Sequence, residues 1–178
     1  MHERKTVAMS QSLAVQENIV LPGDTNAHDT MFGGLLMKHI DETAAISARR
    51  HCRGSVVTAS NDGVHFHRPI QRDDIVILES YVCSVGSTSM EIFVKIMTEN
   101  SSGDHARTIA AISFLTFVAL DHDGKPTEVP LVVPNSVEEK LVYNERLVRK
   151  ETRLKKRQET NELIGSLSAG RTSFRQDG

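Results

Sequence analysis

The sequence predicts an α+β fold in which an antiparallel sheet wraps around one long helix. A single long apolar helix is expected early in the chain, at residues 35–51. Four runs with the two-residue period of strands follow it, joined by short links. Short links favour antiparallel pairing, and a sheet laid over one helix buries the apolar side of each.

The composition is that of an ordinary globular domain and excludes several functions. The 178 residues are 39% hydrophobic and 25% charged, which suits one domain with a sizeable core. A net charge of −2, 4% aromatic residues and no Trp argue against a nucleic-acid partner. Because no run of eighteen apolar residues and no apolar leader occurs, neither a membrane partner nor export is predicted. Cys52 and Cys83 lack metal or disulfide spacing and are interpreted as reduced thiols of a cytoplasmic protein.

We divide the chain into four parts. Residues 1–12 are polar and are expected to be a flexible N-terminus, and residues 13–135 form the folded domain. Residues 136–160 are expected to form a charged C-terminal helix that is a solvated appendage or a subunit contact, because its apolar stripe is thin. Residues 161–178 are expected to be a disordered tail.

The C-terminal helix has its own start signal. Ser136 followed by Glu139 is a capping box, in which each side chain caps the other residue's backbone amide. The basic run Lys155-Lys156-Arg157 fits a solvated face better than a phosphate site.

A polar loop and a pair of glycines precede the long helix. The first strand is expected over residues 13–21 and ends at Pro22-Gly23. The loop at residues 22–32 carries more polar side chains than a turn needs. Gly33-Gly34 then opens the helix, where glycine suits a backbone that closely approaches a ligand at the helix N-terminus. The alternative is a tight packing contact at these glycines.

The long helix is apolar on most sides, which predicts that it is buried. Asp41 shares its face with small and apolar residues, whereas Glu42 lies near Lys38 and is expected to have a structural role. Burial would raise the pKa of Asp41, which would make its carboxylate a stronger general base. The alternative is a buried carboxylate held by backbone amides.

The strands are expected over residues 55–69, 75–85, 90–99 and 107–120. The third shows the clearest alternation, with Met90, Ile92, Val94 and Ile96 on one face and charged residues on the other. A turn at residues 121–126 and an extended segment at 127–135 complete the domain.

Other clusters of reactive residues are weaker signals. His65 and His67 point to one side of a strand and could bind zinc, but no third ligand is placed nearby, so no metal site is predicted. Gly86-Ser87-Thr88-Ser89 is either a phosphate-binding turn or an ordinary hairpin loop. The motifs of serine hydrolases, P-loop nucleotidases and dinucleotide-binding proteins do not occur.

Helix geometry limits how the glycines and the acid can cooperate. Gly34 and Asp41 are seven residues apart, about 10 Å along a helix, so one small group cannot touch both within one chain. If both serve one reaction, two copies of the helix must run antiparallel across a two-fold axis.

The residues resemble those of the hot-dog-fold acyl-CoA thioesterases, the bacterial acyl-CoA hydrolases related to cytosolic brain acyl-CoA hydrolase. The resemblance covers roughly residues 10–140. It rests on the runs Asp24-Thr25-Asn26, Phe32-Gly33-Gly34, Asp41-Glu42, Val56-Val57-Thr58-Ala59 and Gly86-Ser87-Thr88-Ser89-Met90-Glu91. It implies a hot-dog dimer, commonly a trimer of dimers, that hydrolyses fatty acyl-CoA. Coenzyme A is then part of the substrate and product, and no separate cofactor is expected.

The resemblance also implies roles for particular residues. Asn26 and Asp41 would be the catalytic pair, and the amides of Phe32, Gly33 and Gly34 would stabilise the oxyanion. Asp41 would act as general base or as nucleophile, which the sequence cannot separate. The residues expected to contact coenzyme A are Phe32, Thr58, Ala59, Ser60, Phe66, His67, Arg68, Pro69, Gly86, Ser87, Thr88 and Ser89.

One residue departs from the family pattern. Family members usually carry glycine where this chain has Asp29, which puts the loop conformation and the acyl-chain preference in question. Two other functions therefore stay open. A non-catalytic acyl-CoA-binding or nucleotide-binding regulator could use the same fold, and a hot-dog dehydratase would normally need a histidine on the helix.

Overall fold

The computed structural model describes residues 4–100 and 106–170. These residues fall into two compact parts, one up to Tyr143 and one from Asn144 onward. The elements are β1 (Thr6–Ala8), η1 (Met9–Ser12), β2 (Ala14–Ile19), η2 (Pro22–Asp24), α1 (Gly33–Cys52), β3 (Ser55–Phe66), β4 (Ile75–Val85), β5 (Ser89–Glu99), β6 (Arg107–Leu120), β7 (Leu131–Val133), α2 (Val137–Asn144) and α3 (Arg146–Gly170).

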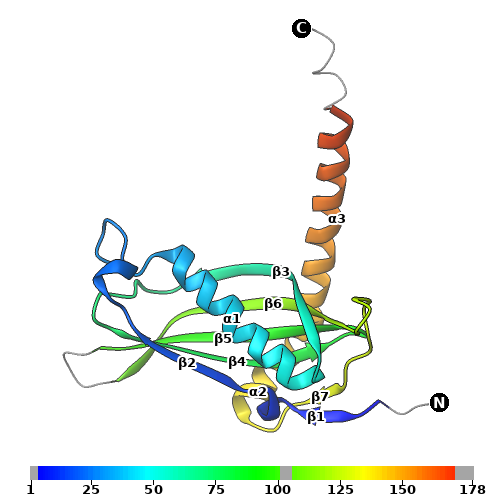
Figure 1. The fold of residues 1–178 in the computed structure, drawn as a ribbon, viewed down its shortest axis with the longest axis horizontal. Coiled ribbons are helices and arrows are strands. Elements are labelled where there is room, and N and C mark those ends of the chain that lie inside the picture. The colour runs from blue at the N-terminus through cyan, green and yellow to red at the C-terminus, as the bar shows by residue number, and fades with distance from the viewer. Residues whose placement is uncertain (1–3, 101–105, 171–178) are drawn as a thin grey trace, which may run out of the picture. The chain divides into compact units, whose positions relative to one another are not determined.

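The first part is a curved sheet with one long helix lying across it (Figure 1). Five antiparallel strands occur in the order β2-β4-β5-β6-β3, and a separate small sheet pairs β1 with β7 in parallel. The predicted α+β class and the hot-dog arrangement are confirmed, and the strand bounds agree closely with the prediction.

Both faces of the sheet are covered within this part. Ser80 of β4 hydrogen-bonds Ser47 of α1 at 2.7 Å, so the side chains in register with Ser80 face the helix. The residues predicted for this face, Met90, Ile92, Val94 and Ile96, are fully buried. The alternate residues were expected to face solvent, but Glu91 is buried too. The reason is that α2 lies against this other face of the sheet, where Glu138 of α2 accepts a 2.6 Å hydrogen bond from Lys95.

One connection differs from the simple meander that short links suggested. The link from β3 to β4 does not join neighbours, because β3 pairs with β6 at the far edge of the sheet. The link instead crosses the end of the sheet, where the amide of Met31 donates to Ile70 O and the amide of Asp73 to Val20 O. The polar loop before α1 therefore supplies hydrogen bonds to the crossing segment.

The N-terminal residues are ordered, contrary to the prediction of a flexible segment at 1–12. Residues 1–3 lie outside the described residues, but β1 pairs with β7, and Met9 is fully buried. Ser12 caps the short helix η1 by donating to Met9 O at 2.7 Å. Polar composition was misleading because β1 is held by its backbone pairing with β7 and by one buried side chain, Val7.

The C-terminal helix also differs from the prediction. The capping box at Ser136 and Glu139 is present, with hydrogen bonds of 3.1 and 2.9 Å. The predicted helix 136–160 is interrupted at Glu145, and α3 continues to Gly170, so residues 161–170 are helical rather than disordered. Side-chain bonds four residues apart, such as Gln158 to Glu162 at 3.0 Å, support the extension. The rest of the predicted tail lies outside the described residues. None of the described helices is long and apolar enough to cross a membrane.

Candidate active site

The N-terminus of α1 presents two backbone amides that its own turn does not use. Phe32 precedes the helix, and its carbonyl accepts from the amides of Leu35 and Leu36 at 3.0 and 3.1 Å. The amides of Gly33 and Gly34 come before these bonds and have no acceptor within the helix. The amide of Phe32 was predicted to join them, but it donates to Asp24 O at 2.7 Å. An oxyanion at this terminus would therefore meet two amides, not three.

The alternative of tight packing at the glycines is met only at Gly34. A Cβ there would lie 2.5 Å from the ring of Phe32, which is itself exposed. A Cβ at Gly33 would meet only the end of the Phe66 ring, at 4.0 Å. The contact is therefore with surface rings and not with the core. The first two residues of the helix thus carry no side chain beside their amides.

Asp41 lies two turns further along the helix and has one well-defined partner. Thr58 of β3 donates its hydroxyl to Asp41 Oδ1 at 2.8 Å. Asp41 is half-buried in the single chain, and its partner is a hydroxyl rather than the backbone amides of the alternative interpretation. A β-bulge at Ala59, next to Thr58, lies in the exposed edge strand. Bulges commonly re-aim side chains beside functional sites.

Glu42 behaves as its helix position predicted. It pairs with Lys38 at 2.8 Å, one turn away. This hydrogen bond lowers the pKa of Glu42 below its ordinary value. The neighbouring acids therefore differ: Glu42 has a cation as its partner, whereas Asp41 is held by a neutral hydroxyl.

Asn26 organises the polar loop rather than pointing freely from it. Its Oδ1 accepts from the amide of His28 at 2.8 Å, and its Nδ2 lies 3.0 Å from the hydroxyl of Thr30. The backbone amide of Asn26 donates to Thr30 O at 2.8 Å, which closes the loop. The predicted catalytic asparagine therefore determines the shape of the loop that leads into α1.

The loop geometry explains the unusual residue in it. Asp29 has a φ of 60°, a left-handed conformation that glycine adopts freely and that aspartate tolerates better than most residues. Its carboxylate pairs with Arg72 at 3.0 Å, and the amide of Arg72 donates to Asp29 O at 3.3 Å. Asp29 thus adopts a backbone conformation that a glycine at this position would also allow.

The residues expected to contact coenzyme A form separate groups. The exposed segment Phe66–Pro69 begins at the last residue of β3, and the ring of Phe66 reaches the first turn of α1. Thr58 contacts Asp41, while the hydroxyl of Ser60 donates to Asp62 at 3.2 Å. The turn Gly86–Ser89 joins β4 to β5. It lies about two strand spacings, or 10 Å, from Thr58 by the strand register.

The first and last of these groups lie at opposite ends of the sheet. Phe66 is in register with Ile96, whereas the turn adjoins Met90, six residues or about 20 Å along the same strand. A single chain therefore does not gather all the predicted contact residues around one small ligand.

The structure offers no support for a metal site at the two histidines. In residues 4–100 and 106–170, no group of three His, Cys, Asp or Glu side chains could hold a metal ion. His65 lies in β3 and His67 just beyond it, where its amide donates to Ala110 O at 2.8 Å. The histidine pair is thus the end of a paired strand.

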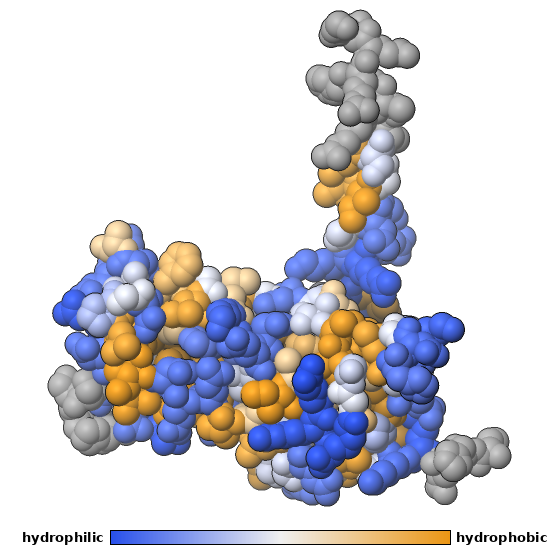
Figure 2. Space-filling model, in the orientation of Figure 1, coloured by the Kyte–Doolittle hydropathy of each residue, from blue (hydrophilic) through white to orange (hydrophobic). Residues whose placement is uncertain are grey.

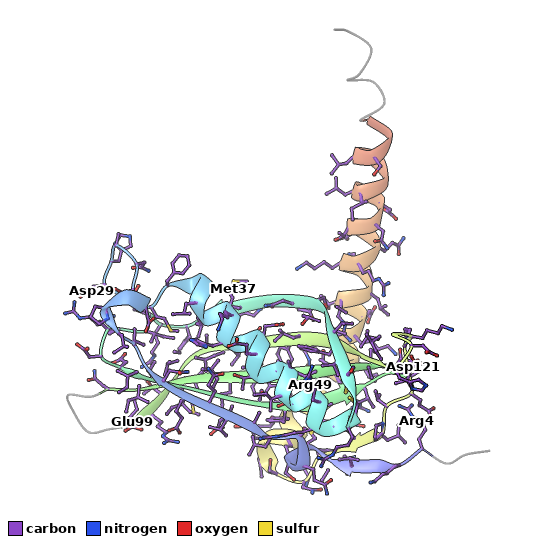
Figure 3. The ribbon with its side chains drawn as sticks, viewed as in Figure 1. Arg4, Asp29, Met37, Arg49, Glu99 and Asp121 are labelled. Atoms are coloured by element: carbon purple, nitrogen blue, oxygen red, sulfur yellow. The ribbon has the colours of Figure 1, made fainter. Side chains whose placement is uncertain are left out.

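The open face of α1 carries apolar side chains that one chain leaves uncovered. Met37 lies on the open face of the helix at 48% exposure (Figure 3), close to the turn that contains Asp41. Phe32, Ile46, Val57 and Phe66 are similarly exposed on α1, its cap and the edge strand. Apolar patches lie among hydrophilic ones on this side of the molecule (Figure 2). Such a surface beside an unpaired strand edge is typical of a subunit contact.

These features define a hot-dog protein whose long helix has two unpaired backbone amides at its N-terminus and a half-buried carboxylate at Asp41. Residues 28–104 match the family model of the thioesterase superfamily. An acyl-CoA thioester hydrolase of Bacillus subtilis, itself described as uncharacterised, is 47% identical over 168 residues, covering 94% of this chain and 96% of that protein. The chain belongs to the thioesterase superfamily, in the group of the acyl-CoA thioester hydrolases.

Solved structures agree with this assignment. The acyl-CoA hydrolase of Staphylococcus aureus, in complex with butyryl coenzyme A, coenzyme A and coenzyme A disulfide, matches at a TM-score of 0.89 and 43% identity, covering 92% of this chain and 99% of that chain. That enzyme was also solved as alanine variants of one aspartate, one asparagine and one threonine. An apo-hexameric acyl-CoA thioesterase matches at a TM-score of 0.82 and 41% identity, covering 85% and 97%.

Proposed function

We propose that this protein is an acyl-CoA thioesterase that hydrolyses fatty acyl-CoA to the free fatty acid and coenzyme A. The observation that carries the proposal is the open face of α1. It presents the unpaired amides of Gly33 and Gly34 and, about 10 Å further along, the carboxylate of Asp41. A thioester needs both a polarised carbonyl and an activated nucleophile, and these groups are suited to supply them.

Two copies of the helix would complete each site. When two α1 helices run antiparallel across a two-fold axis, the amides of one chain meet the carboxylate of the other. The amides of Gly33 and Gly34 would then polarise the thioester carbonyl and stabilise the negative charge that develops on its oxygen. Asp41 of the partner subunit would lie on the other side of the carbonyl carbon.

The reaction can proceed by two routes at that carbon. As a general base, Asp41 takes a proton from water, the water oxygen adds to the carbonyl, and the carbon–sulfur bond breaks as the thiolate takes the proton. As a nucleophile, Asp41 displaces the thiolate to form an acyl anhydride, which water then hydrolyses. Water and acyl-CoA balance either route, so the proposal includes no metal or other cofactor.

Thr58 and Asn26 have supporting roles in this proposal. Thr58 holds one oxygen of Asp41 and leaves the other directed at water or substrate. Asn26 shapes the loop before the two amides and would orient the carbonyl or the water. The aspartate, asparagine and threonine replaced in the S. aureus variants carry numbers two higher than Asp41, Asn26 and Thr58, which supports this trio.

The finer parts of the proposal concern binding, assembly and location. Phe66–Pro69 and the turn Gly86–Ser89 would contact coenzyme A, with Arg68 as a phosphate partner. We propose at least a homodimer and, in line with the hexameric relative, a trimer of dimers. The two free cysteines support a cytoplasmic location with a role in fatty acid metabolism.

A hydrolysis panel over acyl chain lengths tests the proposal. The thiol released from each acyl-CoA is measured for the wild-type protein and for Asp41→Ala. We expect turnover by the wild type for at least one chain length and its loss in the variant. Tight coenzyme A binding without turnover at any chain length would select the regulatory alternative. Unchanged turnover in Asp41→Ala would remove this residue from the mechanism.

A further inference from the structure

The turn between β4 and β5 has all its central carbonyls engaged by the rest of the protein. The carbonyl of Gly86 accepts from Arg4 at 2.8 Å, that of Ser87 from the amide of Val129 at 3.0 Å, and that of Thr88 from the amide of Ala119 at 3.0 Å. The three donors come from three different segments of the chain. Arg4 and Val129, which also bond to each other, therefore hold the first half of the turn, and Ala119 of β6 holds its end.

The same geometry directs the amides of the turn to the other side. In a trans peptide the N–H points opposite to the carbonyl of the preceding residue. The carbonyls of Gly86 and Ser87 face the connected pair Arg4 and Val129 and therefore turn the amides of Ser87 and Thr88 away from that pair. Successive amides that point the same way form a concave site for an anion. Three hydroxyl groups accompany them, and a Cβ at Gly86 would lie only 2.6 Å from the hydroxyl of Ser89.

Of the three donors to the turn, Arg4 is the one that donates from its side chain. Its guanidinium also donates to Val129 O at 3.0 Å, and the amide of Val129 in turn holds Ser87. Arg4 thus fixes two successive residues of the turn, one directly and one through Val129. A planar guanidinium can bridge two carbonyls in this way, whereas an ammonium is a single point charge.

The N-terminal strand places Arg4 at this position. β1 pairs with β7, and the amide of Leu131 donates to Lys5 O at 2.8 Å, directly after Arg4. An ion pair with the exposed Glu128 at 3.5 Å adds to the bonds of the guanidinium. Arg4 lies at the end of the sheet opposite Asp29 (Figure 3), far from the N-terminus of α1.

We propose that Arg4 is a positioning residue that keeps the turn Gly86–Ser89 in the conformation that binds a phosphate of coenzyme A. The inference rests on the proposed function and adds to it the N-terminal strand, which carries no predicted site residue. Arg4 itself is committed to carbonyls of the protein and acts through the turn. Its loss should weaken binding of the phosphate-bearing part of the substrate and leave the chemistry at the thioester intact.

The test compares acyl-CoA with the same acyl group on pantetheine, which has no phosphate. In Arg4→Ala we expect the KM for acyl-CoA to rise about tenfold or more, as for loss of hydrogen bonds from a charged group, with kcat within about twofold. The KM for acyl-pantetheine should stay unchanged. Acyl-dephospho-CoA, which lacks only the 3′-phosphate, shows which phosphate the turn binds.

Matched variants separate positioning from other effects. Lys5→Ala removes the same charge from the neighbouring exposed residue, and we expect wild-type KM values for both substrates. Arg4→Lys keeps the charge but loses the rigid planar fork that reaches Gly86 O and Val129 O together, so it should restore only part of the loss. Full rescue by Arg4→Lys, or an equal rise of KM for acyl-CoA and acyl-pantetheine, would overturn the proposal. Wild-type turnover of acyl-CoA tests the proposed function separately.

Discussion

The apolar side chains of α1 differ in what covers them. On one face Leu36, Ile40, Ala44 and Ala48 are fully buried against the sheet. Away from the sheet, Met37 and Ile46 are nearly half exposed, and they lie before and after Asp41 in the sequence. Apolar patterning therefore identified surfaces that need a cover. It did not show that one cover is the sheet of the same chain and the other, as we propose, a second copy.

The largest expected effect is on the chemistry of the open face. Asp41→Asn keeps the size of the side chain and an oxygen for Thr58 but removes the charge. We expect kcat for acyl-CoA to fall about 10²–10⁴-fold, the usual contribution of a general base, with no change in melting temperature. Glu42→Gln, which alters the adjacent acid, is the control and should keep wild-type turnover. Equal losses in both variants would mean that α1 needs its charge rather than a base at one position.

The closed face should show the opposite pattern. Leu36→Ala removes a fully buried side chain from the core, and we expect the free energy of unfolding to fall by about 2–5 kcal/mol. Chemical denaturation measures this loss. The kcat per folded molecule should stay within about twofold of the wild type. A large loss of kcat in a fully folded sample would show that the two faces are coupled.

The proposed subunit contact can be broken at Met37. Met37→Glu would place an unpaired charge in the interface, and such a charge costs about 3 kcal/mol or more. We expect the dimer dissociation constant to rise at least about a hundredfold, measured by analytical ultracentrifugation, and activity to fall with it. Lys125→Glu, at an exposed position in the turn after β6, is the control for a change of charge. A Met37→Glu monomer with full activity would exclude a shared active site.

Most of the fold could be predicted because it follows from local patterns. The two-residue period of β5 and the glycine pair that opens α1 report directly on backbone geometry and burial. The link after β3 could not be placed, since its crossing depends on hydrogen bonds to Met31 and Val20, which are distant in sequence. The N-terminal strand could not be predicted for the same reason, because its partner β7 lies more than a hundred residues away in the sequence.

The site was predicted in its parts but not in its contacts. Asp41 was found from its position on an apolar helix, but its bond to Thr58 depends on a bulge in β3 that no pattern revealed. The loop at Asp29 has a left-handed backbone conformation, which the presence of an aspartate does not predict. Arg4 carried no signal, because an arginine in a polar terminus is typical of solvated surface.

The support given to Asp41 can be tested at Thr58. Thr58→Val keeps the shape of the side chain but removes the hydroxyl that donates to Asp41. We expect kcat to fall about tenfold, because one hydrogen bond to a charged group is lost while the carboxylate stays. Thr58→Ser, which keeps the hydroxyl, should recover most of the rate. A change of KM alone would assign Thr58 to substrate contact instead.

The smallest expected effect is a pH dependence of stability that arises from His51 in the last turn of α1. His51 is buried and lies 3.0 Å from Pro130 O through Nε2. Burial lowers its pKa below the ordinary value of 6.5, although the bond to Pro130 opposes the shift. The unfolded chain therefore binds a proton that the folded chain resists. Stability is retained above pH 6.5 and falls as the pH drops through that value.

Each unit by which the pKa is lowered corresponds to about 1.4 kcal/mol at most. We expect His51→Gln, which keeps an N–H donor near Pro130 but cannot be protonated, to lose this part of the pH dependence. The measurement is the difference in melting temperature between about pH 7.5 and pH 5.5, compared with the wild type. His39 lies on the same helix but is not fully buried, and His39→Gln should leave the wild-type difference in place. If both substitutions change this difference in melting temperature equally, burial against the sheet is not the cause of the acid sensitivity.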